Sequence, residues 1–388
     1  MIDTSNVAKY ILDKSRWAIA ETEQQPQKWI ETFEVIKAHK VELEAFLEPG
    51  YDVIFTGAGT SEYIGGSVSK ELNLKEDRNF TTVGTPDIVT HPHFYYRKNQ
   101  KTILVSCSRG GSSPESMGAV EHADKLIDNV KHLFIICNTG DNIMMRYAKA
   151  NPDKVFVLKM PDGTFDKSYA MTSSFTCMML ACYLCFNLDR LDELEKHVRS
   201  AAALGKMVLS DYSVPLKELV HATPFQKFNF LGSGNFKYLA QESDIKILEV
   251  SAGRPGTWHD SIPGFRHGPM VTTRAGVDTL TVIFYENSDY VNKYADDMLA
   301  EISNEGRSFN HLLAITPRRT EVTDKLADLT VFLDDPELPA VFLALPISLT
   351  IHMIMLYRGW EYGIGSDCPF GKGGPRGIKT TIYPLEDN

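Results

Sequence analysis

Cysteine is scarce in this chain: there are six among 388 residues, and only one pair, Cys182 and Cys185, has CxxC spacing. That pair lies in an apolar, helix-like segment without a second Cys or His pair near it, which favours small buried thiols over a zinc site or a disulfide. His91 and His93 form another candidate metal pair, but no third ligand at a suitable spacing accompanies them. We therefore expect no metal, and the cysteine usage favours a cytoplasmic protein.

Basic residues are outnumbered by acidic ones, 40 to 50, which gives a formal net charge of −10. No long Lys/Arg run forms a basic stripe. A net-acidic chain repels nucleic acid, so none is expected as a partner. No basic-then-apolar signal-peptide pattern opens the sequence. Two apolar stretches, 170–188 and 338–357, approach the ~20 residues of a membrane span, but polar residues or prolines interrupt them. We interpret both as helices buried in a large domain, and expect no membrane partner.

What the chain does have is an internal repeat. Gly57 and Gly232 each follow an apolar strand-like run, open a Gly-x-Gly turn and stand 175 residues apart, as do the apolar runs 155–158 and 330–333. Strands alternate with helix-length segments in both halves, which predicts parallel sheets covered on both faces. The sequence therefore predicts an α/β protein with an N-terminal helical arm, two doubly wound domains and a C-terminal tail. The expected boundaries are 1–44, 45–200, 215–370 and 371–388.

A serine-rich segment, Ser106–Ser116 (SCSRGGSSPES), lies between a predicted strand and a predicted helix. Ligands of open parallel sheets bind beyond the carboxyl ends of the strands, where this segment falls. One interpretation is helix capping, with Ser113 as N-cap and Pro114 at the first helical position. The other is capture of an anion by helix amides and serine hydroxyls, with Gly110 and Gly111 allowing close approach of the backbone. Capping explains only one or two of the serines, so we favour anion capture, with a phosphate monoester as the anion.

Two nucleotide motifs compete with this interpretation. The lysine of a P-loop is missing, which argues against a nucleoside triphosphate. The dinucleotide fingerprint needs a third glycine, but Glu62 and Lys237 stand at that position in the two halves. Thr60 and Ser61, which follow the first Gly-x-Gly, instead add a second source of hydroxyl donors.

Five motifs together resemble the sugar isomerase (SIS) domain family: GAGTSEYIG, SRGGSSPES, YAMTSSFT, QESDIKILE and GFRHGP. Within it, the chain is most similar to the tandem-domain tagatose-6-phosphate ketose/aldose isomerases, also described as amino-sugar-phosphate deaminase/isomerases. TPDIVTHP, at residues 85–92, resembles a segment typical of that branch. The resemblance covers nearly the whole chain after the arm. It implies flavodoxin-like SIS domains and a phosphosugar ligand.

The resemblance places the sugar's phosphate in the serine-rich segment Ser106–Ser116, which we call the serine loop. The implied contacts are the hydroxyls of Ser61, Ser108 and Ser113, together with backbone N–H groups at Arg109 and Gly110. One position departs from the family, which usually has Ser-Gly where this chain has Gly110-Gly111. The departure leaves two outcomes open, a lower affinity for phosphate or binding by the backbone amide alone.

Glu242, Lys246 and Glu249 stand at i, i+4 and i+7, on one face of a predicted helix. By themselves they read as an exposed stripe with a Glu–Lys pair. The resemblance instead implies that Glu249 is the base that moves a proton between C1 and C2, so we expect it to be partly desolvated. His267, in a Gly/Pro-rich loop beside Arg266, is implied to open the sugar ring, often from a neighbouring subunit.

Three more hydroxyl residues are expected to face the substrate. Thr60 follows the first Gly-x-Gly, and the resemblance implies that Thr172 and Ser173 contact the sugar. The tail is expected to supply a lysine, but its FGKGGPRGIK sequence differs from the usual family ending. It therefore does not distinguish Lys372 from Lys379.

The leading functional hypothesis is an aldose/ketose isomerase that deaminates galactosamine 6-phosphate to tagatose 6-phosphate and ammonia, without a metal or organic cofactor. Plain isomerisation without deamination and a non-catalytic phosphosugar sensor remain alternatives, although no DNA-binding helix-turn-helix is evident. A glutamine-dependent amidotransferase would need an N-terminal Cys nucleophile, whereas the sequence starts Met1-Ile2-Asp3. We expect a homodimer or homotetramer, because family active sites are shared between subunits.

Overall fold

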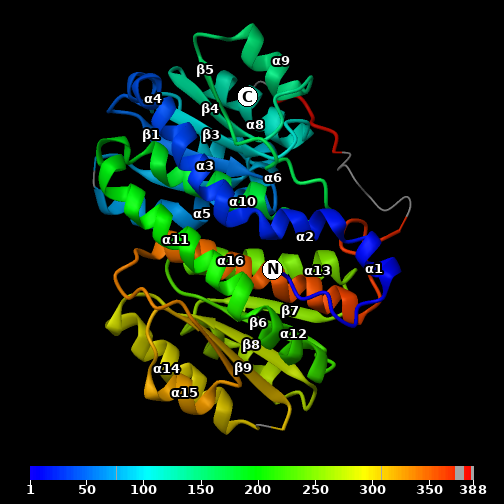
Figure 1. The fold of residues 1–388 in the computed structure, drawn as a ribbon. Coiled ribbons are helices and arrows are strands. Elements are labelled where there is room, and N and C mark those ends of the chain that lie inside the picture. Colours follow the sequence, from blue (N-terminus) through cyan, green and yellow to red (C-terminus); the bar gives the residue numbers. More distant parts are fainter. Residues whose placement is uncertain (76, 307, 372–379, 386–388) are drawn as a thin grey trace. The chain divides into compact units, whose positions relative to one another are not determined.

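Two five-stranded parallel sheets organise the protein (Figure 1). The computed structural model describes residues 1–75, 77–306, 308–371 and 380–385. The strand orders are β2-β1-β3-β4-β5 and, read in the same direction, β7-β6-β8-β9-β10. The first sheet comprises β1 Asp52–Gly57, β2 Phe80–Gly84, β3 Thr102–Ser108, β4 Val130–Ile136 and β5 Val155–Lys159. The second comprises β6 Lys227–Leu231, β7 Gly256–Asp260, β8 Thr279–Phe284, β9 Asn310–Thr316 and β10 Leu329–Phe332.

These identical orders confirm the predicted repeat and the doubly wound α/β fold. The helices between the strands of the first half are α5 Thr60–Leu72, α6 Thr85–Thr90, α7 Pro92–Tyr95, α8 Pro114–Leu126 and α9 Ile143–Ala150, followed by α10 Ser173–Cys185. The second half contains α13 Phe236–Val250, α14 Asp289–Asn304, α15 Glu321–Leu326 and α16 Ala340–Glu361. The predicted arm is helical, with α1 Lys9–Asp13, α2 Arg16–Glu23, α3 Gln25–Ala38 and α4 Lys40–Phe46, and α11 Leu191–Asp211 and α12 Ser213–Ala222 precede β6.

The chain divides into two compact units, each built from discontinuous segments. The β1–β5 unit comprises Glu31–Phe165, Ser173–Leu191 and Pro375–Asn388, and the β6–β10 unit comprises Met1–Ile30, Asp166–Thr172 and Asp192–Gly374. The start of the arm therefore belongs with the second sheet. The linear boundaries expected from the sequence, 45–200 and 215–370, stay a prediction.

Each sheet of the two units carries helices on both faces. In the β1–β5 unit, Ile54 joins a hydrophobic cluster with α6, α8 and α9. Phe55, the next residue and therefore on the opposite face, packs directly against Gly65 of α5. In the β6–β10 unit, α14 and α15 pack on the sheet through a second cluster, while α13 contacts β6, β7 and α16. Strands buried on both faces explain the continuous apolar runs in the sequence.

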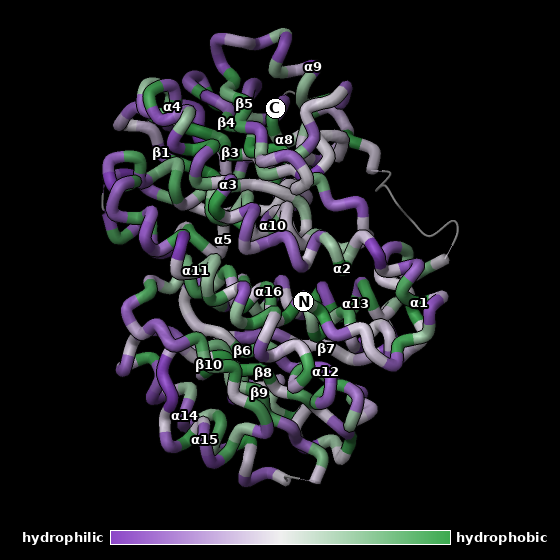
Figure 2. The backbone as a smooth tube through the Cα atoms, viewed as in Figure 1, coloured by the Kyte–Doolittle hydropathy of each residue, from purple (hydrophilic) through white to green (hydrophobic). Residues whose placement is uncertain are grey.

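The two apolar stretches are core helices. All 13 residues of α10 are buried, and the most apolar window of α16, with a mean hydropathy of 2.0, is 94% buried. In Figure 2 the tube of α16 carries mainly hydrophobic colours. Cys182 and Cys185 are buried free thiols of α10, as predicted, and the Cys182 sulfur lies 3.4 Å from that of Cys107. The apolar residues of both stretches therefore lie in the protein core and not on its surface.

The Gly-x-Gly turns keep the same geometry in both halves. A Cβ on Gly57 would lie 2.4 Å from the backbone of Ser61, and one on Gly232 would lie 2.5 Å from the backbone of Phe236. The second glycines, Gly59 and Gly234, have φ of +55° and +58°. Close strand-to-helix packing and the left-handed backbone both need glycine, so these turns are structural features of the fold.

Candidate functional site

The serine loop lies beyond the carboxyl end of β3, as predicted. β3 ends at Ser108 and α8 begins at Pro114. β3 pairs directly with β1, whose following turn carries Thr60 and Ser61 at the start of α5. β2 lies on one side of β1 and β3 on the other, so the strand order reverses between β1 and β3. Open parallel sheets form ligand crevices at such a topological switch point.

The backbone of this loop is held in place before any ligand arrives. Gly111 N–H donates to the Ser108 hydroxyl at 2.9 Å, and Met144 N–H donates to the Gly111 carbonyl at 3.2 Å. Gly111 has a φ of +70°, and a Cβ there would lie 2.5 Å from Asn142 Oδ1. Asn142 cannot easily yield, because its Oδ1 accepts from Met145 N–H at 3.0 Å. A side chain at position 111 would therefore disrupt the loop.

Gly110 is different from its neighbour, although both are glycines. A Cβ at Gly110 would meet nothing closer than Phe165, at 4.0 Å. The serine that the family usually has at this position would therefore fit. The structure offers no steric reason for the departure from the family pattern.

Ser113 occupies the N-cap position of α8, but its side chain does not cap the helix. The hydroxyl instead donates to Glu115 Oε2 at 2.7 Å, and the Thr380 hydroxyl donates to the other oxygen of Glu115. The simple capping interpretation is therefore wrong for this side chain. Burial acts to raise the pKa of Glu115, but hydrogen bonds from Thr380 and Ser113 outweigh it and lower the pKa. To donate to a ligand oxyanion, the Ser113 hydroxyl would have to give up its hydrogen bond to Glu115.

The predicted phosphate ligands are thus gathered at one edge of the first sheet. Thr60 and Ser61 are buried with exposed fractions of 5% and 8%, and both make further contacts in the structure. Ser108 is buried, whereas Arg109 and Gly110 are half-buried. Two helix N-termini, those of α5 and α8, begin at this edge and favour an anion.

The second group of predicted residues lies on α13 in the β6–β10 unit. Lys246 Nζ lies 2.6 Å from Glu249 Oε2 and 3.3 Å from Glu242 Oε1. The Lys246 side chain is fully buried, that of Glu242 is 2% exposed, and that of Glu249 is 25% exposed. An exposed Glu–Lys stripe is therefore wrong, and the expected partial desolvation of Glu249 is present. A buried ammonium between two carboxylates leaves Glu249 as the member that solvent reaches.

Lys246 is held in its charged form. Burial acts to lower its pKa, but the charges of Glu242 and Glu249 and their hydrogen bonds outweigh burial, so the pKa of Lys246 is raised. A lysine in this state stabilises negative charge and can donate a proton, but it does not act as a base at neutral pH.

Sequence reasoning missed His352, on which the charge of Lys246 acts, and the residue that His352 contacts, Gln25. His352 of α16 is 1% exposed, and burial together with the charge of Lys246 lowers its pKa to about 3. Its Nδ1 lies 3.1 Å from Nε2 of Gln25, at the start of α3. His352 is therefore neutral, so that Lys246 is the only cation of this group. The signal available in the sequence was a single histidine inside an otherwise apolar helix.

His267 ends a short 3₁₀ turn, Gly264–His267, and its side chain is exposed, as expected for a residue that acts on a ligand. The adjacent Arg266 is engaged elsewhere, because its Nε lies 2.6 Å from Glu301 Oε2. Gly268 follows with a φ of +142°, which turns the chain after His267. This arrangement fixes the backbone beside His267 and leaves the imidazole accessible.

The two residues predicted to contact the sugar lie at the start of α10. Thr172 and Ser173 are fully buried. Thr172 belongs to the β6–β10 unit and Ser173 to the β1–β5 unit. Thr172 N–H donates to Asp166 Oδ2 at 2.7 Å. Lys372 and Lys379 lie outside the described residues.

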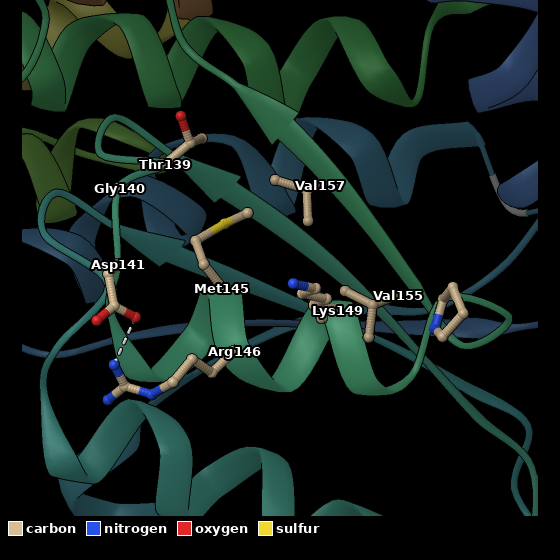
Figure 3. A pocket seen from close by; sticks show the side chains of 10 residues that line it. Thr139, Gly140, Asp141, Met145, Arg146, Lys149, Val155 and Val157 are labelled. Atoms are coloured by element: carbon tan, nitrogen blue, oxygen red, sulfur yellow. Dashed lines mark hydrogen bonds and ion pairs between the residues drawn. The ribbon is translucent and has the colours of Figure 1, made fainter.

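A cavity of about 670 Å³ lies in the β1–β5 unit beside α9 and β5 (Figure 3). Its wall includes Met145, Lys149 and Val157, and Arg146 pairs with Asp141 at 2.6 Å. None of the predicted site residues lines it. Within the described part of the chain, no group of three or more His, Cys, Asp or Glu side chains is arranged to hold a metal ion.

Comparison with known proteins gives closely related enzymes, although no family model matches the chain. The D-galactosamine-6-phosphate deaminase AgaS of Escherichia coli is 34% identical over 312 residues, 79% of either chain. The protein of the same name from Shewanella sp. (strain ANA-3) is 31% identical over 379 residues, 95% of this chain and 92% of that one. The crystal structure of tagatose-6-phosphate ketose/aldose isomerase from Escherichia coli superposes with a TM-score of 0.86 at 29% identity, over 96% of this chain and 97% of that chain.

Proposed function

Because this chain belongs to the SIS-domain phosphosugar isomerases, in the AgaS galactosamine-6-phosphate deaminase branch, we propose that it converts D-galactosamine 6-phosphate and water to tagatose 6-phosphate and ammonia. The relatives span most of the chain, and the fold is theirs. The observation that carries the proposal is the Glu242–Lys246–Glu249 group, in which Glu242 and Lys246 are buried and Glu249 is reached by solvent. Apolar residues in place of a buried ion pair are often as stable or more stable, so stability alone gives little reason for this group.

The serine loop is proposed to hold the phosphate ester. Backbone N–H groups at Arg109 and Gly110, with the hydroxyls of Ser61, Ser108 and Ser113, donate to its oxygens. Two helix N-termini add positive potential at the same edge. Binding energy from the remote phosphate then serves to position the reacting carbons.

Glu249 is proposed to move the proton between the sugar carbons. In the open-chain aldosamine it removes the C2 proton and returns a proton to C1, while the C1 oxygen gains a proton and the amine nitrogen loses one, which leaves a hydroxymethyl group at C1 and an imine at C2. Water then replaces the imine nitrogen, so that ammonia leaves and the ketose forms. The Lys246 ammonium stabilises the negative charge that develops on the substrate oxygen. Glu249 takes the proton as a carboxylate, with Lys246 Nζ 2.6 Å from its Oε2.

His267 is proposed to open the sugar ring, and its exposure is compatible with action on a sugar bound by its own chain or by a neighbouring copy. We propose a cytoplasmic homodimer or homotetramer. Thr60, Thr172 and Ser173 are proposed sugar contacts. No metal or organic cofactor enters this scheme, since the carboxylate and ammonium groups supply the acid and base.

The test is incubation of the purified protein with galactosamine 6-phosphate, with ammonia and ketose 6-phosphate measured separately. We expect equal amounts of both products, and slower turnover of glucosamine 6-phosphate. Formation of ketose from galactose 6-phosphate, without activity on the amino sugar, would indicate a plain isomerase. Absence of turnover with every hexosamine and hexose 6-phosphate, despite binding of the phosphosugar, would indicate a sensor and contradict the proposal.

A further inference from the structure

Glu21, on α2 of the N-terminal arm, is a buried carboxylate that the reaction scheme above does not use. Glu21 is only 5% exposed. Oε1 accepts hydrogen bonds from two consecutive backbone groups, Lys167 N–H and Ser168 N–H, and Oε2 lies 3.2 Å from Ser168 N. These partners are 146 and 147 residues away in the chain, within the same β6–β10 unit.

The segment that Glu21 holds, Asp166–Thr172, is closed on itself by polar contacts. Asp166 Oδ2 accepts from Thr172 N–H at 2.7 Å. The Ser168 hydroxyl donates to the Ala170 carbonyl at 3.0 Å. Asp166, Ser168, Ala170 and Thr172 are all at most 3% exposed. The segment therefore has a defined conformation that ends at Thr172, directly before α10.

This arrangement is costly, because two carboxylates are buried near each other. Burial and the charge of Asp166 raise the pKa of Glu21 to about 7. A neutral amide side chain would accept the same backbone hydrogen bonds without that repulsion. Energetically unfavourable polar groups that persist in a core are more common where a functional segment must be placed.

We propose that Glu21 is a positioning residue of the enzyme, which fixes segment Asp166–Thr172 and through it the sugar contact Thr172. The inference depends on the proposed function, in which Thr172 faces the sugar. It adds a role for the N-terminal arm, since α2 supplies the carboxylate. The position of the segment then sets the position of Thr172.

The experiment compares Glu21→Ala with Glu21→Gln and a matched control, Glu23→Ala. Glu23 lies on the same helix, and its Oε1 accepts from Ile2 N–H at 2.7 Å, away from the segment. For galactosamine 6-phosphate, Glu21→Ala should lower kcat/KM roughly 10–100-fold, as supporting residues commonly do. Glu21→Gln should retain kcat/KM within about threefold, because an amide oxygen still accepts the hydrogen bonds. Glu23→Ala should lose stability with an unchanged kcat/KM.

Equal kcat/KM for Glu21→Ala and Glu23→Ala would overturn the inference. If Glu21→Ala does not fold, Glu21→Asp takes its place, because the shorter carboxylate cannot reach the two amides. The kcat/KM of Glu21→Asp should then be lowered and that of Glu21→Gln retained. Equal kcat/KM values for these two variants would contradict the positioning role. If the wild-type protein has no turnover, the proposed function fails, and calorimetric titration of galactosamine 6-phosphate into the same variants tests the positioning role by the loss of affinity.

Discussion

The edge beyond β3 and the edge beyond β8 occupy equivalent places in the two sheets but carry different chemistry. After β3 the chain presents serines and glycines. After β8 it runs through Glu286, whose backbone N–H donates to Asn292 Oδ1 at 3.1 Å. Ser288 there caps α14 by accepting from Val291 N–H at 3.4 Å. The second loop thus uses its polar groups for its own structure and adds an acid, which makes it unsuitable for phosphate.

The helices after the Gly-x-Gly turns show the opposite division. At the 175-residue offset, Ser67 and Glu71 of α5 stand where Glu242 and Lys246 stand on α13. Ser67 donates to the Tyr63 carbonyl at 2.8 Å, and Glu71 accepts from the Tyr183 hydroxyl at 3.1 Å. These are structural contacts. One repeated fold therefore carries the predicted anion-binding edge in one copy and the predicted acid/base helix in the other.

The largest expected effect tests this division of roles. Glu249→Gln should lower kcat about 10²–10⁴-fold while leaving binding of galactosamine 6-phosphate nearly unchanged, because the amide cannot take the proton. Steady-state kinetics and calorimetric titration measure the two quantities. Glu71→Gln, on the equivalent helix of the other half, should change kcat less than about twofold. A comparable loss in both variants would mean that the α13 carboxylate is structural.

The second prediction concerns the loop glycines. Gly111→Ala should destabilise the protein by about 2–4 kcal/mol and weaken phosphosugar binding, because the φ of +70° and the contact with Asn142 both oppose a methyl group. Gly234→Ala, with a φ of +58° and nothing closer than 3.7 Å, should cost only about 1–2 kcal/mol and leave binding unchanged. Denaturant unfolding and ligand titration check both. Equal binding losses would remove the distinction between the two edges.

The third prediction uses pH. The pKa of Glu21 is about 7 in the folded protein, above its ordinary value of 4.5, so the folded state holds a proton that the unfolded chain releases. Its stabilising contribution is complete below pH 4.5 and is lost as the pH rises to 7, by up to about 3 kcal/mol. The difference in unfolding free energy between wild type and Glu21→Gln should fall over this range.

A carboxylate of the other unit provides the comparison. Burial and the charge of Asp87 also raise the pKa of Glu62. Glu62→Gln should therefore give a pH dependence of the same sign and smaller amplitude. A difference between wild type and Glu21→Gln that is constant between pH 5 and pH 8 would show that Glu21 does not titrate in this range.

The smallest expected effect is a gain. Gly110→Ser should tighten phosphosugar binding by about 1 kcal/mol, roughly fivefold in Kd, since position 110 has room and a hydroxyl adds one hydrogen bond. Gly110→Ala is the matched control, because it adds bulk without a donor and should leave Kd unchanged. If serine weakens binding while alanine does not, the phosphate does not lie against position 110.

Much of the fold was predictable because its signals are local. Apolar runs, the Gly-x-Gly turns and helix-length spacers indicated a repeated α/β architecture without knowledge of contacts. The loop between β3 and α8 was recognisable for the same reason. The second hydrogen bond to Glu115, the acceptor of the Ser113 hydroxyl, was not, because its donor Thr380 is 265 residues away.

The sequence by itself determined the repeat, the serine loop and the spacing of Glu242, Lys246 and Glu249, because backbone preferences and helix periodicity act over a few residues. Only the tertiary structure decided that Glu242 and Lys246 are buried, that the charge of Lys246 acts on His352, and that Glu21 accepts hydrogen bonds from Lys167 and Ser168. Burial and charge depend on which distant segments pack together, and the long-range contacts that set them leave no periodic signal in the chain.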